Sequence, residues 1–92
     1  MNKIAIFDLY RNVLNIIEDA FIENPDLEND EKYIVRINTI THAIVMVENP
    51  VQLPIIYNWV CVFRDECFRH SVGHMIFNSI ADAILECIDD AY

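Results

Sequence analysis

Glycine is almost absent from this chain, and its scarcity narrows the chemistry that the protein can perform. Of 92 residues only Gly73 is a glycine, which excludes the glycine-rich phosphate loops of P-loop and dinucleotide-binding proteins. No GxSxG motif surrounds Ser71 or Ser79, so the nucleophile elbow of the hydrolases is missing as well. The sequence therefore predicts a protein that is not an enzyme and needs no cofactor.

Cysteines and long apolar runs are also few. Cys61, Cys67 and Cys87 are odd in number and form no CxxC pair, which is typical of a reducing compartment rather than of a disulfide framework. No stretch approaches the ~18 apolar residues of a membrane helix, and Asp8 and Arg11 interrupt the short apolar run near the N-terminus. We therefore expect a cytoplasmic protein that does not insert into a membrane.

Basic residues are scarce as well, with six Lys and Arg against fifteen Asp and Glu, a net charge of -9 and an isoelectric point near 4.4. Such a balance disfavours direct binding of nucleic acid and favours basic partners. The length suits one domain, residues 1–92, yet 54% of the residues are hydrophobic. This apolar surplus predicts a second buried surface, most simply a homodimer interface.

Two segments show the apolar spacing of amphipathic helices. From Lys3 to Glu23 apolar residues recur at intervals of three and four. Ser71 is a candidate N-cap for a second helix that runs to the C-terminus. The inner faces expected for these helices are Phe7, Tyr10, Leu14, Ile17 and Phe21 in the first, widened by Val13 and Ala20, and Val72, Ile76, Ile80, Ala83, Ile84 and Cys87 in the second.

The middle of the chain is harder to interpret. Residues 33–48 fit a helical stripe but are rich in β-branched residues, which favours a hairpin, and residues 55–64 alternate as a strand does. Residues 24–32 are expected to form an exposed acidic loop around Pro25. The expected fold is α+β, a three-stranded antiparallel sheet with an N-terminal and a C-terminal helix packed on it; the alternative is an all-α bundle.

Acidic residues cluster at both ends of the sequence. Residues 18–31 contain seven carboxylates and no base, and four more acids close the chain. Carboxylates at i and i+4 on a helix lie about 5 to 6 Å apart, comparable with phosphates along a nucleic-acid strand. The candidate partner-binding residues are Glu18, Asp19, Glu23, Asp26, Glu28, Asp30, Glu31, Asp82, Glu86, Asp89 and Asp90, supported by Asp8, Asp65 and Glu66.

Several of these acids occupy the last turns of the two predicted helices, where the helix dipole disfavours negative charge. Together the placement costs about 2 to 4 kcal/mol of stability, which suggests that the charge has a use. The DLYRNVLNIIEDAFIENPDLENDE start and the IADAILECIDDAY end, with the length and charge of the whole chain, resemble the phage DNA-mimic anti-restriction proteins. The resemblance implies a cytoplasmic dimer that blocks a host restriction endonuclease, and also a histone-like nucleoid protein.

Three other interpretations remain open. The acids could form a solvated surface that confers only solubility, or the chain could be an acidic antitoxin or adaptor that neutralises one basic protein through an apolar patch. The third is a small metal-dependent regulator, because Cys67, His70 and His74 have a zinc-like spacing that Cys61 or Asp65 could complete. Packing roles are commoner for such residues, so no metal is predicted.

Overall fold

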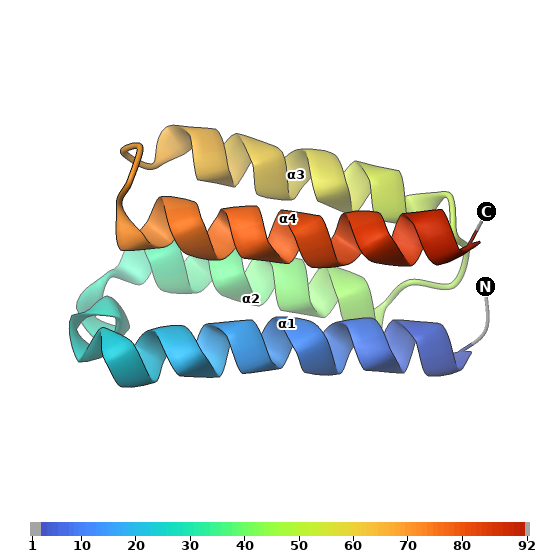
Figure 1. Ribbon diagram of the computed structural model, residues 1–92, viewed down its shortest axis with the longest axis horizontal. Coiled ribbons are helices and arrows are strands. Elements are labelled where there is room, and N and C mark those ends of the chain that lie inside the picture. The colour runs from blue at the N-terminus through green and yellow to red at the C-terminus, as the bar shows by residue number, and fades with distance from the viewer. Residues whose placement is uncertain (1–2, 92) are drawn as a thin grey trace.

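The protein is an antiparallel four-helix bundle in the computed structural model, which describes residues 3–91 (Figure 1). Its elements are α1 (Lys3–Glu23), the short 3-10 helix η1 (Pro25–Asn29), α2 (Glu31–Val45), α3 (Gln52–Glu66) and α4 (Val72–Ala91). Each helix runs opposite to the one before it, and both α1 and α3 pack between α2 and α4. The start of α1 and the end of α4 therefore lie at the same end of the bundle (Figure 1).

The predicted sheet is wrong, because the described residues contain no strand and the all-α alternative describes the architecture. In α2 the buried residues are Tyr33, Ile37, Ile40 and Ile44, which recur at intervals of three and four. This stripe closes the core between the neighbouring helices. Burial on that face outweighs the weak preference of β-branched residues for strands, since intrinsic propensities differ by only about 0.7 kcal/mol per residue or less.

The alternation that suggested a strand in residues 55–64 also belongs to a helix. In α3 the buried residues are Leu53, Ile56 and Val60, again at helical spacing. Pro54 is tolerated because it stands in the first turn, where backbone N–H groups have no partner within the helix. The expected acidic loop is likewise structured, as η1 followed by the first turn of α2.

The two helices predicted at the ends of the chain are confirmed, with one change of face. In α4 the backbone N–H of His74 donates to Ser71 Oγ at 3.2 Å, as expected for a capping serine. In α1 the expected inner residue Phe7 is 58% exposed. The buried residues of α1 are Val13, Ile17 and Ala20, which were expected on the inner face, and Leu9, which was not.

The core contains only apolar side chains and Tyr33 among the described residues. Phe77 is fully buried, and its ring lies 5.6 Å from that of Tyr33 and 5.9 Å from that of Phe63. The Tyr33 hydroxyl is buried without a hydrogen-bond partner, and burial raises the pKa of its phenol well above the ordinary value. Within residues 3–91, no helix combines the length and the apolar character that crossing a membrane requires.

Candidate acidic interface

All fourteen acids predicted as partner-binding residues are exposed. The bundle distributes them over two regions. One is the end that η1 closes, where Glu18, Asp26, Glu28, Asp30 and Glu31 lie on or near η1, and Asp65 and Glu66 stand at the end of α3. The remaining acids lie on α1 and α4.

The two acids of α3 are held by bases rather than being free to meet a partner. Arg36 of α2 forms an ion pair with Glu66, and its guanidinium lies 5.4 Å from the centre of the Phe63 ring. Arg64 Nε donates to Asp65 Oδ1 at 3.1 Å. These are the ion pairs of the described residues, so a basic partner would have to compete with Arg64 and Arg36 for the charges of Asp65 and Glu66.

Part of the acidic cluster between α1 and α2 has a structural role. The backbone N–H of Tyr33 donates to Asp30 Oδ1 at 3.0 Å, which makes Asp30 the N-cap of α2. Glu31 follows in the first turn, where the positive end of the helix dipole stabilises a carboxylate. The charge of these two residues is therefore explained by helix initiation.

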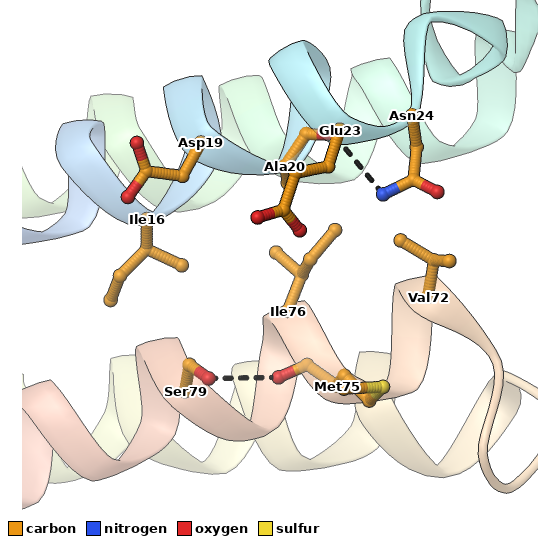
Figure 2. A pocket seen from close by; sticks show the side chains of 9 residues that line it. All are labelled: Ile16, Asp19, Ala20, Glu23, Asn24, Val72, Met75, Ile76 and Ser79. Carbon is orange, nitrogen blue, oxygen red and sulfur yellow. Dashed lines mark hydrogen bonds between the residues drawn. The ribbon is translucent and has the colours of Figure 1, made fainter.

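The seam between α1 and α4 forms an open hollow of about 470 Å³. Figure 2 shows Glu23 directing its carboxylate toward Ile76 across the seam, with Asp19 one helical turn away. The residues that line the hollow are Ile16, Asp19, Ala20, Glu23 and Asn24 from α1 and its end, and Val72, Met75, Ile76 and Ser79 from α4. The hollow thus has an apolar floor and an acidic rim on the α1 side.

A second hollow of about 410 Å³ continues the first along the same seam. It is lined by Asn12, Asn15, Ile16, Ser79, Asp82, Ala83 and Glu86. Because Ile16 and Ser79 border both hollows, the two form one continuous groove, which we call the α1–α4 groove. Its α4 wall runs from Val72 to Glu86, about 21 Å at the helical rise of 1.5 Å per residue.

Four carboxylates therefore border the α1–α4 groove in two diagonal pairs. Asp19 and Glu23 stand on the α1 wall near η1, and Asp82 and Glu86 stand on the α4 wall further along. Each pair has i, i+4 spacing, so its side chains project from one face of their helix. None of the four belongs to an ion pair of the described residues.

Three more acids extend these rows by helical spacing. Asp8 lies eleven residues before Asp19, close to three full turns, and Asp89 and Asp90 lie one turn beyond Glu86. Because α1 and α4 are antiparallel, all three fall toward the same end of the groove. The α1–α4 side of the bundle therefore presents seven carboxylates.

The groove is suited to a basic and partly aliphatic ligand. Lysine and arginine bury their methylene stems on apolar surfaces while the charged end remains near water or an anion. The floor that Ile16, Ala20 and Ile76 provide could receive the stem, and the acidic rim could receive the charge. The groove can therefore bind a cationic side chain through its charge and its apolar stem together.

Cys67, His70 and His74 are not brought together as metal ligands. No group of three His, Cys, Asp or Glu residues within the described range could hold a metal ion. The Cys67 thiol donates to the Phe63 carbonyl at 3.4 Å, and His74 Nδ1 lies 3.2 Å from the Arg64 carbonyl oxygen. The zinc interpretation therefore has no support from the geometry.

Sequence reasoning identified the four carboxylates of the groove but missed most of the residues that lie between them. Ile16, Met75 and Ser79 gave no signal, because nothing in the one-dimensional pattern says which helix will pack against which. A helical wheel places Asn15 and Asp19 on one face, but only the α1–α4 packing gives that face an opposite wall.

An acidic four-helix bundle with a grooved carboxylate surface is the class of protein that this fold and surface define. Searches of protein-family models, curated proteins and solved structures find no match to this chain.

Proposed function

We propose that this protein is a non-enzymatic DNA mimic whose α1–α4 groove binds the basic, DNA-binding surface of another protein. The partner class is a DNA-binding protein of the host cytoplasm, such as a restriction endonuclease or a histone-like nucleoid protein. The observation that carries the proposal is the groove itself, where Asp19, Glu23, Asp82 and Glu86 line both walls without an ion-pair partner among the described residues. The resemblance to phage anti-restriction proteins points the same way.

The charge density of this side limits how well it can replace a duplex. Double-stranded DNA carries one negative charge per ~1.7 Å, or about 12 over the ~21 Å of the groove. Four carboxylates border the groove and seven lie on that side of the bundle. The groove therefore offers roughly a third of the duplex charge over its length, and the three further acids lie beyond one of its ends. We expect the protein to displace DNA only in molar excess.

The adaptor interpretation makes a different demand on the structure. An adaptor that neutralises a basic partner through an apolar patch would need charge and exposed apolar residues on one surface. Trp59 and Ile55, two exposed apolar residues of α3, lie on the helix diagonally opposite α1. The groove interpretation predicts that substitutions at these two positions leave partner binding intact, whereas the adaptor interpretation predicts its loss.

A competition assay tests the proposal directly. A fluorescent duplex is bound to a purified histone-like nucleoid protein, and its release by this protein is followed by anisotropy at low salt. Because salt by itself weakens the DNA complex, the salt dependence is measured on the direct complex of this protein with the nucleoid protein, without DNA. That affinity should fall as salt rises from low to moderate concentration. A parallel capture from bacterial lysate, eluted with a salt gradient, widens the search to restriction endonucleases.

A matched pair of variants separates the groove from overall charge. The groove variant is Asp19→Asn, Glu23→Gln, Asp82→Asn and Glu86→Gln, and the control variant is Asp26→Asn, Glu28→Gln, Glu31→Gln and Glu48→Gln. Both lose four negative charges, so long-range attraction falls equally. We expect the groove variant to lose at least about tenfold more affinity than the control. Equal losses would mean that the acids act only through net charge, and the groove proposal would be wrong.

A further inference from the structure

Charge is segregated between the two halves of the bundle. Residues 32–64, which form nearly all of α2 and α3, contain three bases and one acid, Glu48, for a net charge of +2. The remaining residues contain the other three bases and fourteen acids, for a net charge of -11. The remainder includes Glu31, Asp65 and Glu66, which stand at the ends of α2 and α3 nearest η1. Over their full lengths α2 and α3 carry three bases and three acids, whereas α1 and α4 carry two bases and eight acids. The side of the bundle that α2 and α3 form is therefore close to neutral along its middle, and the α1–α4 side is acidic.

The α2–α3 side carries an apolar stripe. In α3 no residue from Gln52 to Phe63 is charged. Four large apolar residues on this helix are about half exposed and follow one another at spacings of four, four and three. They are Val51 (60%), which is the N-cap of α3, and Ile55 (52%), Trp59 (45%) and Val62 (53%) within the helix. An unbroken row of this kind on a helix surface is the pattern of a packing face.

The orientation of the stripe follows from its neighbours. Arg64 reaches Asn78 of α4, which marks the α4 side of α3, and Phe63 lies under Arg36 of α2, which marks the α2 side. Trp59 is one turn before Phe63 and so flanks the α2 side. The stripe therefore faces outward beside α2 and away from the α1–α4 groove.

We propose that a second copy of this chain covers the stripe, in a two-fold dimer built on the outer face of α3 with the adjoining side of α2. A two-fold interface brings a surface against itself, so a face of one charge sign repels its own copy. A two-fold contact through the α1–α4 groove would oppose carboxylates to carboxylates. On the α2–α3 side the stripe has no charged residue from Gln52 to Phe63, so two chains of net charge -9 can meet there without that repulsion.

The dimensions of the molecule suit such a dimer. The bundle measures 36 × 22 × 18 Å, so one long side offers roughly 650 to 800 Å² of projected area. A standard protein interface buries about 800 Å² per partner. Trp59 stands near the middle of the stripe, where a buried aromatic residue contributes most to binding. In the dimer both acidic grooves face outward on opposite sides.

Sedimentation equilibrium of the purified protein tests the dimer without any partner. We expect twice the chain mass of 10.8 kDa at high concentration and the chain mass on dilution. Trp59 is the single tryptophan, so its emission should shift to the red as dimers dissociate. Added salt should tighten the dimer, because it screens repulsion between the two acidic bodies. A monomer at every concentration and salt level would overturn the proposal.

Two variants locate the interface. Trp59→Glu should weaken self-association by at least about tenfold, whereas Ile22→Glu, on an exposed residue of α1, should leave it unchanged. Circular dichroism checks that both variants are folded. Equal effects of the two, or no effect of Trp59→Glu, would place the contact elsewhere and refute the dimer proposed here. The dimer and the proposed function fail separately, since salt is expected to strengthen the dimer and to weaken binding of a basic partner.

Discussion

Neutralising the acids in the last two turns of α4 should make the protein more stable. Glu86, Asp89 and Asp90 are exposed near the negative end of the helix dipole, and no base stands in the last turn of α4. Each such carboxylate costs about 0.3 to 1 kcal/mol. The variant Glu86→Gln, Asp89→Asn, Asp90→Asn removes all three charges while keeping the shape of each side chain.

Repulsion within the helix adds to the expected gain. Glu86 stands four residues after Asp82 and four before Asp90, and like charges at this spacing destabilise a helix by a few tenths of a kcal/mol per pair. Because the side chains are exposed and water weakens these interactions, we take the lower half of the range, about 1 to 2 kcal/mol in total. For a domain of this size each kcal/mol raises the melting temperature by roughly 4 to 8 °C.

Urea unfolding followed by circular dichroism measures the change in the free energy of unfolding. The gain should shrink at high salt, which screens exposed charges. Glu31→Gln is a control that should lower the free energy of unfolding. Glu31 stands in the first turn of α2, where the helix dipole stabilises a carboxylate. A triple variant that is no more stable than the natural chain at low salt would refute the claim that these acids are placed at a cost.

Further expectations concern the core, the turns and the cysteines. Tyr33→Phe removes a buried hydroxyl without a partner, so the free energy of unfolding should rise by about 1 kcal/mol; a loss would reveal a hidden partner. His70 has φ 70°, so His70→Gly should stabilise the α3–α4 turn by up to about 1 kcal/mol, while His70→Val should destabilise it, as thermal unfolding would show. Asp30→Ala removes the cap of α2 and should cost about 1 kcal/mol, seen as a lower urea midpoint. Burial raises the pKa of the Cys67 and Cys87 thiols above the ordinary value of 9.0. At neutral pH both thiols are protonated in the folded and in the unfolded chain. Above about pH 9 the unfolded chain loses these protons first, so the free energy of unfolding should fall as pH rises. Replacing both cysteines by alanine should flatten that alkaline decline; an unchanged profile would contradict it.

The terminal helices could be predicted because their local pattern has one interpretation. Residues 72–91 keep an apolar face at three- and four-residue spacing, and a serine stands where the helix begins. Residues 33–48 lacked this clarity, because Val35, Thr39 and Thr41 suit a strand as well as a helix. Their conformation was decided by Tyr33 and Ile40, which lie on one helical face and fill the core with Phe77 and its neighbours.

The candidate acidic interface could likewise be predicted only in part from the sequence. Sequence was enough to show that Asp8, Asp19 and Glu23 share one side of a helix, turned away from most of its apolar residues. It could not show that Asp65 and Glu66 meet Arg64 and Arg36, because Arg36 lies thirty residues from its partner along the chain.

The sequence alone determines the net negative charge of this protein and the segment of the chain that is almost free of charge, because charge is a property of each side chain. The side-by-side placement of α1 and α4 is a product of the folded bundle, and it lets Asp19 and Asp82 border one groove although more than sixty residues separate them. The same packing turned an almost uncharged middle segment into one side of the molecule. The physical reason is that the fit of apolar stripes, and not the charges themselves, selects which helices become neighbours.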